Sequence, residues 1–327
     1  MTLARRWAAL LVLIVFASCT AERGDRIAFL LSTLQEERYQ KDQRYFETAA
    51  RAHGLTTLTL SADNDSARQL AQVEDALARG ARVLVIQPTD SAAAGGFVAR
   101  AHAQGAKVVA YDRAVPGADV YVAHDSYRIG VLQAQGAIAR TGGRGNFVLL
   151  EGQSGHSVAR EIARGYHDTL RPYVERGEII IVVDKNHDAW SPEQALTTVE
   201  DALAKTGGDV AAVLANNSGM ARGAVQAIQA AGLGARGIFI AGADADAANI
   251  GYVCEGKQSL EILKDIQPLA EQAAAIAAAL AHGQPLGPEA ADGVIEVPVI
   301  AVTAADVGPI VIARGFHPAA ALPACTK

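Results

Sequence analysis

The apolar positions of the chain alternate between short continuous runs and longer amphipathic stretches. The runs at Ile27 to Leu31 and Val83 to Ile86 are typical of strands buried on both faces of a parallel sheet. The amphipathic stretches have helical length, and several stop at a glycine, as residues 40–53 do before Gly54. This alternation predicts strands at 27–31, 55–60, 83–88, 108–110, 146–150, 179–183, 209–215 and 239–242, and helices at 40–53, 66–79, 91–104, 130–140, 160–176, 192–205, 220–231 and 265–282.

The second half of the chain repeats the scheme of the first. No linker rich in Pro, Gly or Ser separates the halves, so the chain must cross between them in short segments. Strands that alternate with helices form βαβ units and parallel sheets. The sequence therefore predicts an α/β fold of two Rossmann-like lobes whose strand ends face one cleft.

Residues 1–19 form a predicted export signal rather than part of the fold. Arg5 and Arg6 precede an apolar run from Ala8 to Phe16, which is too short to span a membrane stably. The following Phe-Ala-Ser-Cys resembles a bacterial lipobox, which would make Cys19 the lipidated first residue. A lipobox usually begins with Leu, whereas this one begins with Phe16. The alternative is therefore ordinary signal cleavage, which would release a soluble protein. The expected location is the periplasmic or cell-surface side of a bacterial membrane, with a lipid anchor as the only membrane contact.

The rest of the chain, about 300 residues, is long enough for two lobes with their own cores. The hydrophobic share of 50% and the aromatic share of 5% are those of a globular protein. A formal net charge of −6 offers no basic surface for nucleic acid or anionic lipid. Cys254 and Cys325 form either a disulfide, which an exported chain favours, or two separate buried thiols.

The most informative stretch is the strand at 108–110, which leads into Tyr111, Asp112 and Arg113. Ligands of open α/β sheets bind beyond the carboxyl ends of the strands, where this charged pair would stand. A carboxylate accepts hydrogen bonds from neighbouring hydroxyls, and a guanidinium donates in a fork, so the pair suits a neutral polyol. A surface ion pair at the end of a strand is the alternative.

Further polar residues follow other strands, and each of them singly fits an ordinary loop or helix cap. Trp190 stands in a polar segment, where a large aromatic has little local core to join. Aromatic faces stack on sugar C–H groups, while amides, carboxylates and guanidinium groups bind hydroxyls, so the set has the chemistry of a carbohydrate site. Its members are Arg38, Tyr39, Asp112, Arg113, His124, Asp125, Ser126, His156, Arg160, Trp190, Asn217, Asp244 and Lys264.

Several segments resemble one family, the ribose/galactose-type (type I) periplasmic sugar-binding proteins, and in particular its D-xylose-binding members. The resemblance covers nearly the whole chain after the signal. It rests on Gln-Glu-Glu-Arg-Tyr-Gln-Lys-Asp at 35–42, Ala-Tyr-Asp-Arg at 110–113, Asp-Ala-Trp-Ser-Pro-Glu at 188–193, Asn217, Gly-Ala-Asp-Ala-Asp at 242–246 and Gly-Phe-His at 315–317.

The resemblance implies two lobes joined by a hinge of three strands. The first lobe would comprise residues 25–125 and 265–296, and the second residues 126–264 and 297–327. The sugar would lie between Tyr39 and Trp190, and Arg160 would reach in from the second lobe. Its hydroxyls would be held by Arg38, Asp112, Arg113, Asn217, Asp244 and Lys264.

The chain departs from the family pattern at several of these positions. Tyr39 stands where the xylose-binding members have Trp, and Ser126 and Ser218 replace Asn and Asp. His156 and Arg160 lie in a segment that differs from its family counterpart, which has Lys at the position of Arg160. The Gly-rich connection before His156 would expose that residue to the cleft. These differences concern which sugar is bound.

Nothing in the sequence indicates an enzyme, a metal or a cofactor. The eight histidines are scattered without ligand spacing, and neither Gly-x-Ser-x-Gly nor a phosphate-binding loop is present. Sugar-responsive repressors share the lobes but begin with a DNA-binding helix-turn-helix, which the signal segment replaces here. Two roles stay open. The chain either delivers a monosaccharide to the membrane permease of an ABC importer, or presents it to a sensor kinase or chemoreceptor. An enzyme built on the same lobes is the third interpretation.

Overall fold

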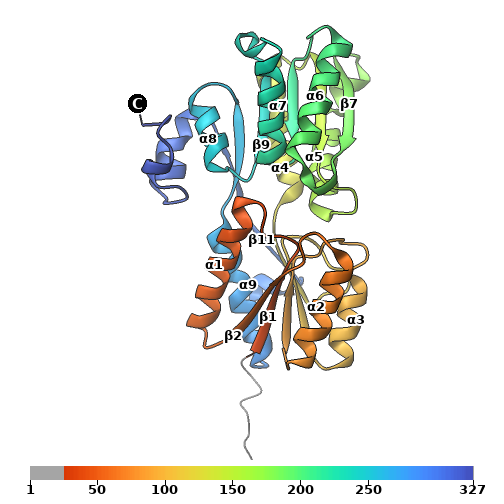
Figure 1. Cartoon of the computed structure of the whole chain (residues 1–327), viewed down its shortest axis with the longest axis vertical. Coiled ribbons are helices and arrows are strands. Elements are labelled where there is room, and N and C mark those ends of the chain that lie inside the picture. The colour runs from red at the N-terminus through yellow and green to blue at the C-terminus, as the bar shows by residue number, and fades with distance from the viewer. Residues whose placement is uncertain (1–25, 327) are drawn as a thin grey trace, which may run out of the picture.

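The computed structural model describes residues 26–326, which form two α/β lobes that lie one above the other in Figure 1. Each lobe is built on its own six-stranded sheet. The predicted fold class is therefore confirmed. The predicted export signal, with Cys19, lies outside the described residues.

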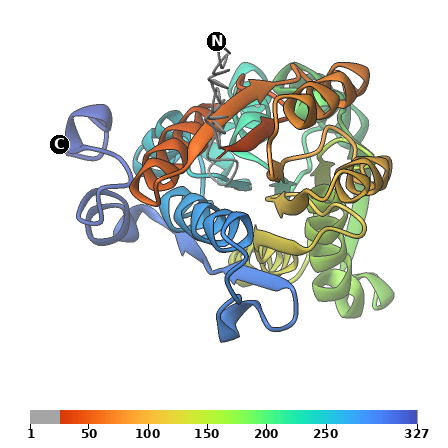
Figure 2. The same cartoon turned by 90° about the horizontal axis from the view of Figure 1, so that it is seen from below.

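The first lobe contains a parallel sheet in the order β11-β5-β4-β3-β1-β2. Alternate residues of β1 face opposite sides: Ile27 and Phe29 pack toward α1 and α9, and Ala28 and Leu30 toward α2 and α3. Figure 2 shows α1 and α9 side by side on one face. The strands are β1 (Arg26–Leu31), β2 (Thr56–Ser61), β3 (Val83–Ile86), β4 (Lys107–Tyr111), β5 (Val120–His124) and β11 (Val294–Val297), and the helices are α1 (Glu37–Ala52), α2 (Ser66–Ala78), α3 (Gly95–Ala103) and α9 (Ile266–Ala281).

The second lobe contains a sheet in the order β12-β10-β9-β8-β6-β7, in which only the edge strand β12 runs antiparallel to its neighbour. The strands are β6 (Gly145–Glu151), β7 (Ile179–Asn186), β8 (Ala212–Ala215), β9 (Phe239–Ala243), β10 (Leu260–Lys264) and β12 (Val299–Val302). The helices are α4 (Ser126–Thr141), α5 (Ser157–Glu175), α6 (Pro192–Thr206), α7 (Ser218–Ala230) and α8 (Ala247–Cys254).

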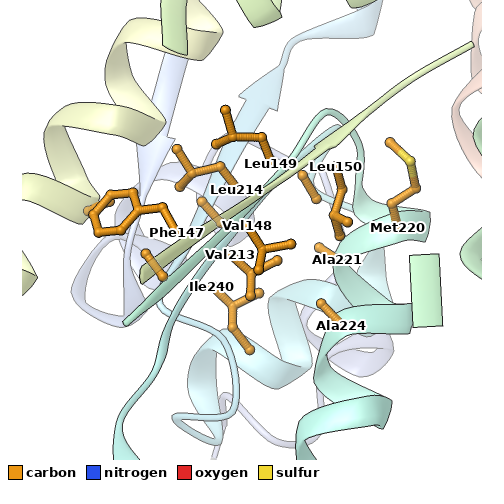
Figure 3. Close-up of a cluster of buried hydrophobic side chains, with 14 of the residues drawn as sticks. Phe147, Val148, Leu149, Leu150, Val213, Leu214, Met220, Ala221, Ala224 and Ile240 are labelled. Atoms are coloured by element: carbon orange, nitrogen blue, oxygen red, sulfur yellow. The ribbon is translucent and has the colours of Figure 1, made fainter. Parts of the chain in front are cut away.

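Figure 3 shows part of the apolar core of the second lobe. Phe147 to Leu150 on β6 pair with β8, and Met220, Ala221 and Ala224 come from α7. All of these side chains are fully buried. The small alanines allow α7 to lie close to the sheet, so the ends of the strands beside it are held in fixed positions.

The chain passes between the lobes after β5, after β10 and again between β11 and β12. Residues 303–326, which follow β12, pack on the second lobe, and a disulfide joins Cys254 of α8 to Cys325. The pairing that the sequence left open is thus present in the structure. His317 Nε2 donates to Ala245 O (2.8 Å), and its Nδ1 lies 3.5 Å from Lys41 Nζ of α1. The C-terminal segment therefore contacts both lobes.

All of the predicted helices and strands are present, with their ends shifted by a few residues. α4 begins at Ser126 rather than Gly130, because the Asp125 carboxylate accepts from Arg128 N (2.8 Å) and caps the helix there. β5, α8, β10, β11 and β12 were not among the predicted elements. Within residues 26–326, no helix is both long and apolar enough to cross a bilayer.

Candidate functional site

The turn after β4 directs two charged side chains into the space between the lobes. Asp112 has a φ of 59°, and Arg113 N donates to Tyr111 O, only two residues back, at 2.6 Å. Such a tight turn is strained for a residue with a side chain. Asp112 and Arg113 are only 3% and 2% exposed. The pair is therefore a buried feature, not the surface ion pair that the sequence left as an alternative.

Arg38 of α1 connects carboxylates from both lobes. It donates from Nη2 to Asp112 Oδ1 (3.0 Å), from Nη1 to Asp244 Oδ1 (3.4 Å) and from Nε to Asp42 Oδ2 (3.3 Å). Lys264 Nζ lies 2.6 Å from the same Asp244 oxygen. All five groups are buried. One guanidinium thus holds together acids from α1, from the turn after β4 and from the loop after β9.

The neighbouring cations keep the Asp112 carboxyl ionised. Burial by itself would raise its pKa, but Arg38, Lys264 and Arg113 outweigh burial and hold the pKa well below its usual range. A carboxylate has about four lone-pair positions, so Asp112 can accept further hydrogen bonds while it holds Arg38. The turn therefore presents an anionic acceptor that a ligand hydroxyl can use.

A series of hydrogen bonds leads from the first lobe to Trp190. Arg113 Nη2 donates to Tyr39 Oη (3.1 Å). His156 Nε2 donates to Thr89 O of the first lobe (2.7 Å), since a carbonyl oxygen can only accept, and His156 Nδ1 accepts from the indole N–H of Trp190 (2.8 Å). Burial, reinforced by Arg113, lowers the pKa of His156 to about 3, so the ring is neutral, as these two bonds require. The predicted aromatic surface is thereby tied to both lobes.

Trp190 also belongs to the core of the second lobe, which corrects the expectation that it has little core to join. It is 8% exposed and packs within the apolar cluster of that lobe. A Cβ atom on Gly152 would lie 2.6 Å from its ring, so only glycine fits there. The expectation was wrong because Gly152, at the end of β6, is distant from Trp190 in the sequence.

Asn217 and Asp244, which the sequence could not distinguish from helix caps, have different roles. Asn217 Oδ1 accepts from Met220 N (2.8 Å) and caps α7. The Asp244 carboxylate instead pairs with Lys264 and with Arg38 of the other lobe. Both residues line a groove between the lobes, and there Asn217 caps a helix and faces the groove at the same time.

The groove has a volume of about 580 Å³, within the usual range for small-molecule sites. The residues before and at the start of α1, among them Glu36, form one wall. Trp190, Asn217 and Asp244 belong to the opposite wall. The groove therefore combines an aromatic side chain with amide and carboxylate groups, as the strand-end residues predict.

The backbone is strained at three of the candidate residues, and two of them, Trp190 and Asp244, line this groove. Asp112, Trp190 and Asp244 all have positive φ values, of 59°, 57° and 105°. The other non-glycine residues with positive φ in the described part of the chain are Asp63, Asn64, Ala189 and Ala245. Strained conformations cost free energy and persist where the surroundings enforce them, most often at binding sites. Three of the side chains singled out from the sequence are held in this way.

The structure does not bring Arg160 to the other candidate residues. Its side chain is 64% exposed, and its closest carboxylate is Glu161, with Nε 3.9 Å from Oε1. Arg160 lies on the outer face of α5, since Ala159 and Ile162 face the core. The role that the resemblance implies for it, reaching into the cleft, has no counterpart in this arrangement.

The sequence assigned no role to three buried residues that position the cluster. Asp42 holds Arg38, and burial raises the pKa of Asp42 to about 6. Gln87 Nε2 donates to Asp112 Oδ2 (3.2 Å). Glu261 accepts from Ala245 N (3.0 Å), and burial raises its pKa to about 8. Gln87 directly follows β3, so the strand-end signal could have found it, whereas Glu261 lies inside a strand and gives no such signal.

One group of possible metal ligands lies outside the groove, although the sequence indicated none. Single ligand atoms of Glu151, His167 and Asp184 lie within 4.8 Å of one another. Burial, with Asp184 beside it, raises the pKa of Glu151 to about 7. His167 Nε2 lies 3.1 Å from Asp184 Oδ2 and 3.8 Å from Glu151 Oε1, so the three side chains pair with one another and we assign no metal there.

The two lobes, the three crossings and the buried polar cluster between them define a class of hinged binding protein. The periplasmic binding protein domain family matches residues 27–285, and the chain belongs to that family.

The chain is 35% identical over 301 residues to the D-xylose-binding periplasmic protein of Escherichia coli (strain K12), covering 89% of this chain and 91% of the relative. The D-xylose-binding periplasmic protein of Haemophilus influenzae is 34% identical over 314 residues, which cover 93% and 94%. A carbohydrate transporter solute-binding protein from Chloroflexus aurantiacus, solved in complex with D-glucose, is 27% identical, with a TM-score of 0.81 and coverage of 91% and 98%. The resemblance derived from the sequence motifs is confirmed.

Proposed function

We propose that the protein binds a neutral monosaccharide, D-xylose or a similar aldose, between its two lobes and delivers it to the membrane permease of an ABC importer. The observation that carries this proposal is the buried cluster of Arg38, Asp112, Asp244 and Lys264, which joins the lobes. Identity of 35% to a D-xylose-binding relative supports the choice of ligand. The proposal does not include a catalytic step.

The cluster suits a ligand without net charge. Its cations and carboxylates are already paired with one another, so an ionic ligand would leave one of them unpaired at a cost of several kcal/mol. A sugar hydroxyl donates and accepts at once, so it can join a carboxylate and a guanidinium without displacing their charges. Trp190 offers apolar contact to the C–H groups of such a ring.

Ligand release requires the lobes to separate. We propose that residues 25–125 with 265–296 and residues 126–264 with 297–327 move as two bodies about the three crossings. Contacts such as Arg38 to Asp244 and His156 to Thr89 join these bodies and would break on opening. A ligand that touches both lobes stabilises the closed form, because only that form lets both contacts exist.

The proposed membrane attachment is a lipid on Cys19, with no protein segment in the bilayer. If the proposal holds, the mature protein fractionates with membranes, and Cys19→Ala abolishes lipid labelling and leaves the chain unprocessed or soluble. Wild-type protein that is cleaved elsewhere and recovered free of membranes would exclude the anchor. It would leave the proposed sugar binding intact.

Isothermal titration of the purified protein against D-xylose, other aldopentoses, glucose, galactose and cyclitols tests the proposed ligand class. One of these neutral compounds should bind with a Kd of micromolar or below. Small-angle scattering with and without that compound should show a smaller radius of gyration in the bound protein. If no neutral sugar or cyclitol binds, the proposed function is wrong.

A further inference from the structure

His124 lies buried where two of the crossings meet, and its Nδ1 has no partner among the described residues. It ends β5, where the chain leaves the first sheet, and it is 3% exposed. Its Nε2 lies 3.2 Å from the backbone oxygen of Asp265, where the chain returns after β10. Its Nδ1 is fully buried and makes no hydrogen bond to any of the described residues. The ring thus connects two of the three crossings through one nitrogen only.

The bond to Asp265 decides what the other nitrogen can do. A carbonyl oxygen has no hydrogen to give, so Nε2 carries the proton and Nδ1 presents a lone pair. Burial, together with Arg38 and Lys264, lowers the pKa of His124 to about 3, so the ring stays neutral and Nδ1 remains an acceptor at physiological pH. An unused buried acceptor destabilises the protein unless something donates to it.

The surroundings indicate which kind of group donates. Arg38, Lys264 and Asp112 are the charged residues close enough to influence His124. All three belong to the cluster that the proposed function assigns to the ligand. The guanidinium of Arg38 already donates to three carboxylates, and Lys264 Nζ is paired with Asp244. The free acceptor therefore fits a donor that arrives with the ligand.

We propose that His124 Nδ1 accepts a hydrogen bond from one hydroxyl of the bound sugar and thereby selects against analogues that lack this hydrogen. The inference rests on the proposed function and adds to it a specificity-determining residue. A deoxy sugar has no hydrogen to donate at that position. A sugar acid that places its carboxylate there has none either, because an ionised carboxylate only accepts.

The test is isothermal titration of wild type, His124→Phe and His124→Asn with the best ligand of the sugar panel and with each of its monodeoxy analogues. His124→Phe should bind the parent sugar about 10- to 100-fold more weakly, since the replacement is of similar size but accepts no hydrogen bond. For one monodeoxy analogue, wild type and His124→Phe should bind equally. His124→Asn restores an acceptor and should recover part of the affinity. His53→Phe, an exposed change at the end of α1, is the matched control and should bind as wild type does.

The outcomes separate the two proposals. If wild type binds no neutral sugar or cyclitol, the proposed function fails, and the inference about His124 fails with it. If wild type binds a sugar but His124→Phe keeps the same affinity and the same ratios across all monodeoxy analogues, only the inference is overturned. Should His124→Phe fail to fold, which thermal unfolding without ligand reveals, the comparison of His124→Asn with wild type over the same analogues decides.

Discussion

The two walls of the cleft are built in different ways. On the wall of the first lobe, Asp112 and Arg113 are held by ion pairs and hydrogen bonds to Arg38, Gln87 and Tyr39. On the wall of the second lobe, Trp190 is held by its backbone conformation and by packing. Asp112 and Arg113 are thus positioned by charge, whereas Trp190 is positioned by shape, with the Asp244–Lys264 ion pair beside it. Loss of one side chain should accordingly affect binding through unpaired charge on the first wall and through lost contact area on the second.

The largest effect on affinity is expected at Asp112. Asp112→Ala removes one of the three carboxylates that Arg38 holds, leaves Gln87 Nε2 without its acceptor and removes an acceptor for the ligand, so ligand binding should weaken by about 2–4 kcal/mol. Titration with the ligand found in the sugar panel measures the change. Asp75→Asn on α2, an exposed carboxylate paired with Arg79, is the control and should bind normally. Unchanged affinity in Asp112→Ala would mean that the charged wall does not contact the ligand.

A smaller loss is expected at Trp190, but it should come with a loss of stability. Trp190→Ala removes contact area and stacking, about 1–3 kcal/mol of binding free energy. It also leaves a cavity beside Gly152, so thermal unfolding without ligand should occur at a lower temperature. Trp190→Phe keeps an aromatic face and should lose less binding free energy and less thermal stability than Trp190→Ala. A Trp190→Ala protein as stable as wild type would contradict the claim that packing specifies this wall.

Acidification should weaken binding through the histidines that are neutral in the closed form. The pKa of His156 is about 3 here, against an ordinary value of 6.5, because burial and then Arg113 disfavour its charged form. A group with a depressed pKa stabilises the closed form above its ordinary pKa, and this contribution is lost as pH falls from about 6.5 toward 3. The pKa of His124 is also lowered, so its protonation opposes the closed form in the same way. Each of the two histidines should lower the affinity about tenfold between pH 7.5 and pH 5.5, so together they should lower it by up to about a hundredfold.

His156→Gln provides the control for this pH effect, because glutamine does not titrate between these values. Its affinity should be lower than that of wild type at pH 7.5 but should depend less on pH. Titrations of both proteins at matched ionic strength give the comparison. An equal pH dependence in the two proteins would exclude His156 as a source of the effect.

The smallest effect is expected at Arg160. Its side chain is exposed on α5, so Arg160→Ala should change affinity and stability by less than about 0.5 kcal/mol. The same titration measures it, with Arg164→Ala, one helical turn further along the same exposed face, as the parallel case. A loss as large as that of Asp112→Ala would show that Arg160 does contact the ligand.

Some of the site was predictable because its signals are local. Asp112 and Arg113 directly follow an apolar strand, and the predicted strand itself fixes where they point. The helical period of α5 also indicates where Arg160 lies. Ala159, Ile162 and Ala163 form the buried face of the helix, so Arg160 falls on the exposed face.

Other features depend on contacts between distant segments, which a single sequence does not reveal. Trp190 joins the core only because the end of β6 passes beneath its ring at Gly152. His124 finds Asp265 more than a hundred residues away. The role of Glu261 depends on the loop after β9 that lies against it. In each case the same residue type could occupy a core, a loop or a binding site, and only the tertiary structure shows which of these it occupies.

The order in which the chain visits the two lobes has a consequence for its synthesis. The first sheet receives its edge strand β11 and the covering helix α9 only after the whole of β6 to β10 has been made. The second sheet receives β12 later still, followed by the C-terminal segment that the Cys254–Cys325 disulfide attaches to α8. A nascent chain that has just completed β10 therefore carries two unfinished sheets with open edges at β5 and β10, which are sites for misassembly. We expect the first lobe to be completed only once β11 has been made, and the second only once β12 and the segment with Cys325 have followed.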